Sequence, residues 1–135
     1  YLLNDASVKL GIPVVHGSIF RFEGQVTVFD PRNGVTYRDM QPQIPTENVV
    51  PNCAEAGVLG VLPGIVGSMQ ALETIKLILN IGEDLSGRLV VFDSLEMTFH
   101  EYAIKRDPNN QITWENRDSI GITEIDQTCT SASES

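Results

Sequence analysis

The sequence predicts an α/β fold in which a mixed sheet with antiparallel strands is combined with one long buried helix. A proline-started, mostly apolar stretch at 63–79 has helical periodicity. Short apolar segments at 12–17, 25–29, 88–92 and 98–104 have the length and residue types of strands. The 135 residues are enough for one domain with a real core.

The first ten residues are typical of the end of a helix, and Gly11 is a typical stop signal. The apolar side chains that we expect on its buried face are Leu2, Leu3, Ala6 and Leu10. Because no Met and no N-cap residue precede this helix, we expect it to begin upstream. We therefore infer a fragment of a longer protein.

The strands are predicted to differ in their surroundings. The run 12–17 is apolar without alternation, which is typical of a parallel strand buried on both faces. The run 25–29 alternates and closes at the turn 30–34, which predicts an antiparallel strand that is half exposed. Gly82 is the expected end of the long helix, and 88–92 pairs with 98–104 in a hairpin.

Two segments have no usable periodicity. Residues 39–56 contain three prolines, which rule out a continuous helix, and a stretch of this length is usually functional or disordered. Apolar residues become sparse after 106, and the chain ends in a polar run. We therefore predict a domain at 1–106 and a linker or flexible tail at 107–135.

Composition excludes several function classes. The net charge of −9 and the lack of a basic patch argue against nucleic acid or an anionic membrane as a partner. The longest weakly polar run, 58–69, is too short for a bilayer span. Two distant cysteines do not make a disulfide scaffold, so we expect a reducing cytoplasm. The chain has neither a phosphate-binding glycine loop nor a cysteine or histidine pair with metal-ligand spacing.

Cys53 is the residue with the most chemical interest. It lies between the proline-rich segment and a glycine-rich helix entrance, where helix amides could stabilise a thiolate. Residue patterns alone favour the alternative of a buried cysteine that acts as a small apolar side chain. A thiol redox protein is a weaker alternative, since no second cysteine is near in the sequence.

Three segments together resemble the MoeB/ThiF/HesA family of enzymes that activate ubiquitin-like sulfur carriers. They are 1–6 (YLLNDA), 16–29 (HGSIFRFEGQVTVF) and 50–67 (VPNCAEAGVLGVLPGIVG). The likeness continues at 67–76 and 87–93 and covers about 1–108.

The resemblance implies the carboxy-terminal half of a Rossmann-like domain. Members of the family are usually homodimers that use ATP and Mg²⁺ to adenylylate the terminal glycine carboxylate of a carrier of the MoaD or ThiS type. The carriers serve molybdopterin, thiamin or tRNA thiolation pathways. The family's ATP- and metal-binding groups lie upstream of Tyr1 in its pattern, so we expect this fragment alone to be inactive.

The resemblance also implies site residues. The segment 39–56 matches a loop that crosses over the carrier's tail, and Cys53 matches a cysteine that in several members forms a covalent intermediate with the carrier. The expected carrier-tail binding residues are Asn52, Ala54, Glu55 and Gly57.

Two positions depart from the family pattern. Many members hold structural zinc with two Cys-x-x-Cys pairs, and here these positions read YRDM at 37–40 and PNNQ at 108–111. We therefore predict no zinc and another means of fixing the loop. The tail resembles a linker to a rhodanese domain, which is a possible downstream neighbour.

A non-catalytic module is the alternative function. Such a module would bind a β-grasp carrier or the protein's own amino-terminal half. Half a sheet would expose apolar surface, so we also expect dimerisation, strand swapping or co-purification with that half.

Overall fold

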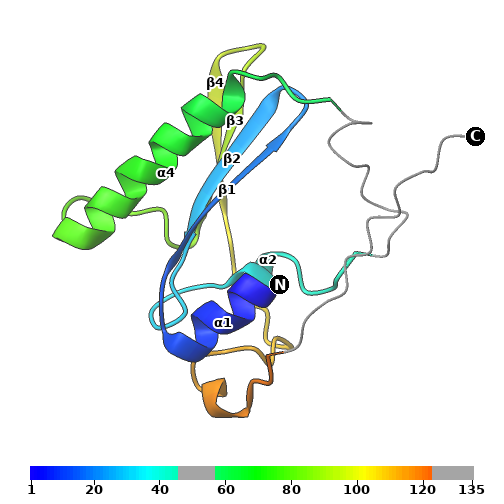
Figure 1. Cartoon of the computed structure of the whole chain (residues 1–135), viewed down its shortest axis with the longest axis vertical. Coiled ribbons are helices and arrows are strands. Elements are labelled where there is room, and N and C mark those ends of the chain that lie inside the picture. The colour runs from blue at the N-terminus through cyan, green and yellow to red at the C-terminus, as the bar shows by residue number, and fades with distance from the viewer. Residues whose placement is uncertain (46–56, 123–135) are drawn as a thin grey trace, which may run out of the picture.

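The computed structural model describes residues 1–45 and 57–122. Figure 1 shows the arrangement of the elements. In chain order they are α1 (Leu2–Leu10), β1 (Val14–Phe20), β2 (Glu23–Phe29), α2 (Tyr37–Met40), α4 (Leu62–Leu79), β3 (Arg88–Asp93), β4 (Thr98–Ala103) and the short 3₁₀ helix η1 (Arg117–Ser119).

The strands form one antiparallel sheet in the order β1-β2-β3-β4. The prediction of a parallel strand buried on both faces is therefore wrong. The strand extends to Phe20, is only partly buried and pairs with β2. The chain reverses at Arg21, whose φ of 54° lies in the left-handed region, and this tight turn makes an antiparallel pair.

Strand β2 is antiparallel, as predicted, but it is not half exposed. Val26 and Val28 are completely buried, and so is Thr27 on the other face. The strand is buried because it lies between β1 and β3 in the sheet and because α4 packs on it. The hairpin of β3 and β4 is confirmed, with Arg88 opposite Ala103 and Asp93 opposite Thr98.

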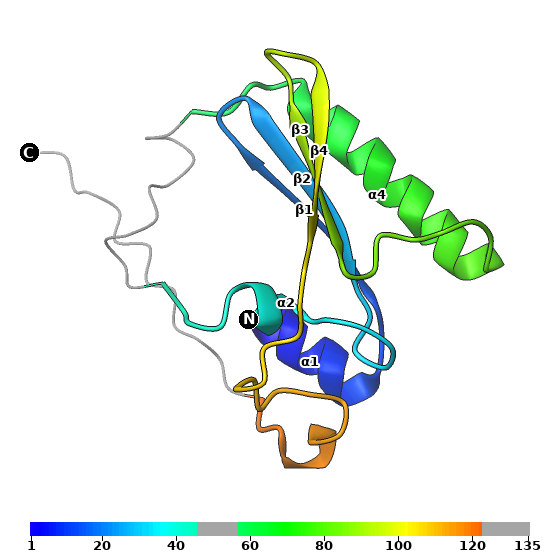
Figure 2. The same ribbon diagram turned by 180° about the vertical axis from the view of Figure 1, so that it is seen from behind.

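Helix α4 runs along one face of the sheet (Figure 2) and packs against β1 and β2. Two glycines allow its close approach. A Cβ at Gly24 would lie 2.5 Å from Val66 Cγ2, and one at Gly17 would lie 2.5 Å from Gln70 Cδ. Gln70 Nε2 also donates a hydrogen bond to the carbonyl of Val15 at 3.1 Å.

The α/β fold class is confirmed, but the burial of α4 is one-sided. The buried residues of the helix are Leu62, Val66 and Glu73, whereas its opposite face is solvent-exposed. The expectation of a buried helix is therefore met on one side only, because among the described residues the sheet covers a single face of α4. By length and composition α4 could cross a membrane, a test that core helices of soluble proteins also pass.

The predicted helical range 63–79 is confirmed by α4 (Leu62–Leu79), but the residue that stops the helix is not Gly82. Asn80 ends it and adopts the left-handed conformation (φ 51°). Asparagine tolerates this conformation because its short polar side chain can hydrogen-bond locally. The buried Glu73 fixes the connection that follows, since it pairs with Lys76 and accepts a hydrogen bond from the backbone N–H of Leu85.

Helix α1 and its stop at Gly11 are confirmed. Its buried face, however, consists of Asn4, Ser7 and Val8, while Leu3 and Leu10 are exposed. The buried polar side chains have partners, because Asn4 accepts a hydrogen bond from Tyr37 and Ser7 donates one to Ile12. Satisfied polar groups can be buried at low cost, so hydropathy alone assigns the wrong face.

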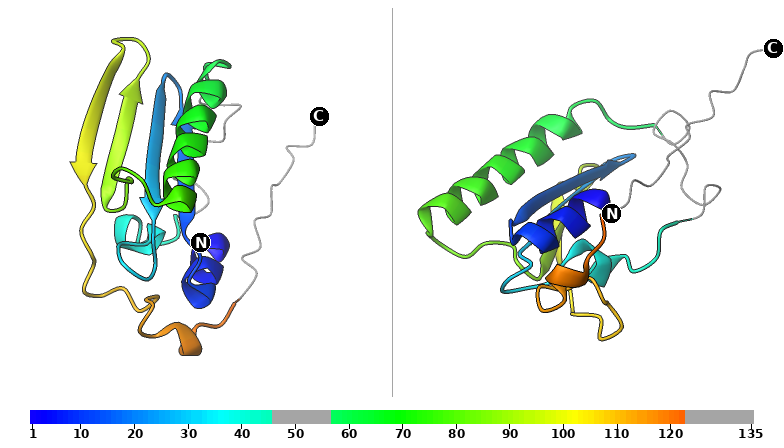
Figure 3. Two further views of the ribbon diagram at one scale, coloured as in Figure 1. Left: turned by 90° about the vertical axis from the view of Figure 1, so that its left-hand side faces the viewer. Right: turned by 60° about the horizontal axis from the view of Figure 1, so that its bottom comes forward.

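Residues 107–122, which we interpreted as the start of a linker, lie below α1 in the left-hand view of Figure 3. Ile120 is buried, and its carbonyl accepts a hydrogen bond from Lys9 Nζ at 2.6 Å. The Trp114 ring contacts the guanidinium groups of Arg32 and Arg117. The domain boundary at 106 stays a prediction.

Candidate functional site

The predicted site residues fall mostly in the part of the chain that the structure leaves undescribed. Cys53, Asn52, Ala54 and Glu55 lie outside the described residues. Gly57 is described, exposed, and in the left-handed conformation (φ 72°). The structure therefore describes the two ends of the predicted carrier loop, and the roles of these five residues stay predictions.

The loop begins at α2, a single helical turn that the proline-rich composition did not predict. Thr36 caps it: its backbone N–H and its hydroxyl donate to Asp39 Oδ2 at 2.7 and 3.1 Å, and its carbonyl accepts from the Asp39 N–H. This is a capping box with Asp in the third position. The Thr-x-x-Asp spacing is the sequence signal that could have located this helix.

An ion pair holds α2 against α1. Arg38 donates from Nε and a terminal nitrogen to the two oxygens of Asp5, at 2.7 and 2.8 Å. Burial alone would raise the pKa of Asp5, but hydrogen bonds from Arg38 and Asn4 and the charge of Arg38 together lower it. Arg38 is therefore engaged within the fold and does not offer a free guanidinium to an anion.

Aromatic rings fill the space between α1, the sheet and α2. The His16 ring lies 5.5 Å from Phe29 and 5.6 Å from Tyr37, and Tyr37 packs edge-on against Tyr1. Burial lowers the pKa of His16, which favours the neutral imidazole. The Tyr1 hydroxyl donates to the carbonyl of Gln43 at 2.5 Å, so this cluster also holds the start of the loop.

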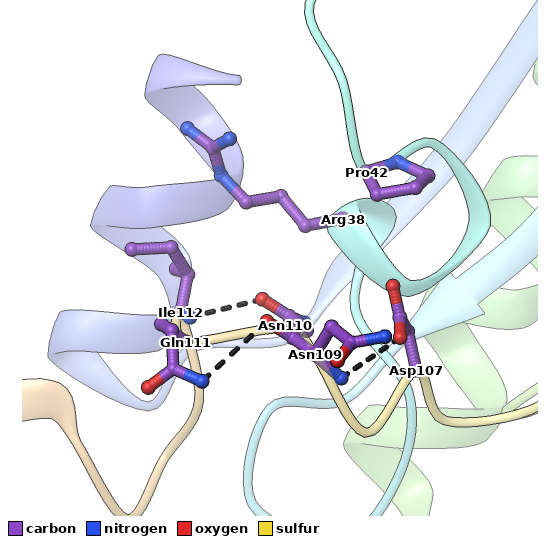
Figure 4. A pocket seen from close by; sticks show the side chains of 7 residues that line it. All are labelled: Arg38, Pro42, Asp107, Asn109, Asn110, Gln111 and Ile112. Atoms are coloured by element: carbon purple, nitrogen blue, oxygen red, sulfur yellow. Dashed lines mark hydrogen bonds between the residues drawn. The ribbon is translucent and has the colours of Figure 1, made fainter.

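A second set of contacts joins α2 to the chain after β4. Asp39 Oδ1 accepts hydrogen bonds from the Asp107 N–H at 3.1 Å and from Asn110 Nδ2 at 2.9 Å. Two of these partners, Asp107 and Asn110, line a cavity of about 280 Å³, whose lining side chains Figure 4 shows. Its lining residues are Arg38, Pro42, Asp107, Asn109, Asn110, Gln111 and Ile112.

The far end of the loop is tied to the turn between β1 and β2. Val58 forms a parallel bridge with Arg21, and the Leu59 N–H donates to the Arg21 carbonyl at 3.0 Å. A second cavity, of about 370 Å³, opens between β1 and the start of α4. It is lined by Gly17, Ser18, Ile19, Val58, Pro63, Val66 and Gln70.

The zinc site implied by the family resemblance does not fit the residues present. Segments 37–40 and 108–111 offer neither thiol nor imidazole, and their one carboxylate, that of Asp39, is occupied by hydrogen-bond donors. Within residues 1–45 and 57–122, no group of three or more His, Cys, Asp and Glu side chains could hold a metal ion.

Comparison with known proteins identifies the family. Residues 1–113 match the ThiF family. The chain is 51% identical over 113 residues to the probable adenylyltransferase/sulfurtransferase MoeZ of Mycobacterium tuberculosis, which covers 81% of the chain and 29% of that protein. It is 45% identical over 130 residues to the SAMP-activating enzyme E1 of Haloferax volcanii, over 96% of the chain and 48% of that protein.

A third relative is the sulfur carrier protein adenylyltransferase of Thermus thermophilus, 47% identical over 113 residues, which covers 80% of the chain and 42% of that protein. Among solved structures, E. coli MccB in complex with MccA-N7isoASN superposes with a TM-score of 0.64 over 82% of the chain and 35% of MccB, at 14% identity. That likeness supports the fold.

The chain spans between 29% and 48% of the length of these three relatives. The family match nevertheless extends from the first residue through β4 and into the segment that Asp39 holds. On this evidence the chain belongs to the ThiF family.

Proposed function

We propose that this chain is part of an ATP-dependent adenylyltransferase that activates the terminal glycine of a ubiquitin-like sulfur-carrier protein, with residues 1–106 as the carboxy-terminal part of its adenylyltransferase domain. The observation that carries the proposal is the identity of 45–51% to relatives that are named for adenylyl transfer or carrier activation. The matched stretches cover between 80% and 96% of the chain.

The proposed first step is nucleotidyl transfer. A carboxylate oxygen of the carrier attacks the α-phosphorus of ATP, the bond to the β-phosphate breaks, and pyrophosphate leaves. The product is a mixed anhydride, which turns an unreactive carboxylate into an electrophile. We expect the groups that bind ATP and Mg²⁺ to lie outside this chain, so the chain alone should be inactive.

The proposed contribution of this chain is to hold the carrier's tail. The loop between α2 and α4 would cover the tail, and both of its ends are fastened: by Asp5–Arg38 and Tyr1–Gln43 at the start, and by Leu59–Arg21 at the end. Fixed ends reduce the number of conformations that the loop must lose when it closes on a ligand.

Cys53 is the candidate for a second step. Its thiolate would attack the carbonyl carbon of the acyl-adenylate, release AMP and leave the carrier joined to the enzyme as a thioester. A sulfide-level donor, supplied from outside this chain, would then attack the thioester carbonyl, release the Cys53 thiolate and leave the carrier as a thiocarboxylate. Asn52, Ala54, Glu55 and Gly57 flank this cysteine and are the candidates for contacts with the tail.

The test is ATP–pyrophosphate exchange by the full-length protein with β-grasp proteins from the same source that end in Gly-Gly. We expect exchange that requires both Mg²⁺ and the carrier's terminal glycine. Cys53→Ala should keep the exchange and lose the carrier adduct that a non-reducing gel detects. The matched control, Cys129→Ala, should keep both. Exchange without any carrier would contradict the proposal.

A non-catalytic module is the second candidate, and the absence of a phosphate-binding glycine loop from these 135 residues favours it for the isolated chain. Such a module would bind a β-grasp carrier, or the amino-terminal half of its own protein, without exchange. Binding of the carrier by the full-length protein with no exchange under any condition would select this alternative.

The proposal also covers the pathway and the assembly of the full-length protein. We propose that its carrier is of the MoaD or ThiS type and serves a molybdopterin, thiamin or tRNA thiolation pathway. We propose further that the protein is a homodimer in the reducing cytoplasm, with a rhodanese domain downstream. Deletion of each candidate carrier gene, followed by measurement of molybdopterin, thiamin and thiolated tRNA in the cells, would identify the pathway.

A further inference from the structure

The Asp39 carboxylate is the centre of a closed hydrogen-bond network. An ionised carboxylate has about four lone-pair sites, and four donors point at this one. The Asp107 N–H and Asn110 Nδ2 reach Oδ1 at 3.1 and 2.9 Å, while the Thr36 N–H and hydroxyl reach Oδ2 at 2.7 and 3.1 Å. No acceptor site of this carboxylate is left for a further ligand.

The partners of Asp39 are satisfied as well. The Thr36 hydroxyl accepts a hydrogen bond from Asn110 Nδ2 at 3.3 Å, and Asn110 Oδ1 accepts one from the Ile112 N–H at 2.9 Å. Thr36 is 4% exposed, so this network is shielded from water on that side. Networks in which each polar group has a partner hold their geometry more firmly than isolated bonds.

The network joins segments that are far apart in the sequence. Asp39 and Asn110 are 71 residues apart, and between them lie the predicted carrier loop, α4 and the β3–β4 hairpin. These contacts fix α2 to the chain that leaves β4, on one wall of the cavity in Figure 4.

We propose that the hydrogen bonds of Asp39 join α2 to residues 107–112 without a metal ion. They take the structural role that the family resemblance gives to zinc at segments 37–40 and 108–111. A metal there would have to displace the donors from Asp39 and would find no charged side chain in 108–111. The neighbouring Asp107 carboxylate already accepts a hydrogen bond from the Asn109 N–H at 2.9 Å. The test of this proposal requires no carrier, and its outcome does not depend on whether the protein catalyses adenylylation.

The test is thermal unfolding of the full-length protein and its variants. Asp39→Asn replaces one acceptor oxygen with a donor NH₂ group that faces other donors. We expect its Tm to fall by about 3 °C or more. The matched control is Asp118→Asn, which removes the same charge from an exposed residue of η1 and should leave the Tm within about 1 °C of the wild type.

A double variant tests the direct contact between the two side chains. Asn110→Asp alone places two carboxylates against each other and should lower the Tm more than Asp39→Asn does. The double variant Asp39→Asn/Asn110→Asp restores an amide opposite a carboxylate, and its Tm should lie above that of Asn110→Asp. A double variant no more stable than Asn110→Asp would overturn the proposed contact.

A chelator tests the absence of a metal at this position. Dipicolinate should shift the Tm of the wild type and of Asp39→Asn by the same amount, whether that amount is zero or reflects a metal elsewhere. A chelator-induced fall in the wild type that is missing from Asp39→Asn would mean that Asp39 holds a metal, and would overturn the proposal.

Discussion

The Asp5 carboxylate holds α2 in place through its two-point contact with Arg38, and both side chains are largely buried. Because the folded-state pKa of Asp5 is lowered, this contact contributes stability that is fully present above the ordinary pKa of about 3.9 and is lost as the pH falls through the folded value. We expect Asp5→Asn to lower the free energy of unfolding by about 1 kcal/mol at pH 7.

Urea unfolding at pH 7 and at pH 3 measures this effect. The difference between Asp5→Asn and the wild type should shrink at the lower pH, because below the ordinary pKa of about 3.9 the unfolded wild-type chain takes up a proton at Asp5 and is stabilised relative to the folded state. Glu96→Gln, at an exposed carboxylate in the β3–β4 turn, is the control and should have little effect at either pH. A difference that is equal at the two pH values would contradict the ion-pair explanation.

His16 gives a second pH-dependent contribution at the residue scale. Its folded-state pKa is lowered by burial against Phe29 and Tyr37. The unfolded chain therefore takes up the proton first, so stability is highest above the ordinary pKa of about 6.5 and falls as the pH drops below it. We expect His16→Phe to flatten the dependence of Tm on pH below about 6.5, because phenylalanine cannot take up a proton.

At the scale of elements, the close packing of α4 on the sheet depends on glycine at two strand positions. Gly24→Ala would place a methyl group 2.5 Å from Val66 Cγ2, and the helix has to move to accommodate it. We expect the free energy of unfolding to fall by about 1–3 kcal/mol.

Gly67→Ala is the matched control for this substitution. Gly67 lies on the outer face of α4, where a Cβ would meet nothing within 4 Å. Alanine should raise the free energy of unfolding by about 0.5–1 kcal/mol, because it favours the helix over the unfolded chain. Chemical denaturation of both variants measures the contrast, and a Gly24→Ala protein as stable as Gly67→Ala would show that the helix is not pressed against β2.

At the scale of the whole molecule, the outer face of α4 is an exposed apolar surface. Leu72, Ile75, Ile78 and Leu79 have between 49% and 76% of their area exposed. A soluble domain rarely keeps such a surface uncovered, so we expect the isolated chain to self-associate as its concentration rises. The variant Ile75→Glu/Ile78→Lys should remain monomeric.

Light scattering across a range of concentrations measures this association. Leu95→Glu is the control, because Leu95 is 70% exposed but lies in the β3–β4 turn and not on α4. It should associate as the wild type does. A wild-type chain that stays monomeric at high concentration would contradict the prediction.

The sequence alone determined most of the local elements and indicated the family. The stop at Gly11, the long helix and the β3–β4 hairpin follow from residue preferences and periodicity, which act over a few neighbouring residues. The resemblance around Cys53 located the predicted carrier loop, whose central residues lie outside the part that the structure describes.

Tertiary structure decided which faces are covered and which polar residues are joined. The central place of β2, the polar buried face of α1 and the exposed side of α4 depend on which elements pack together. The contact between Asp39 and Asn110 joins residues 71 positions apart, and periodicity carries no information over that separation. The sequence contained the capping signal at Thr36, but only the folded chain brings Asn110 to it, because burial and long-range hydrogen bonds are properties of the assembled elements.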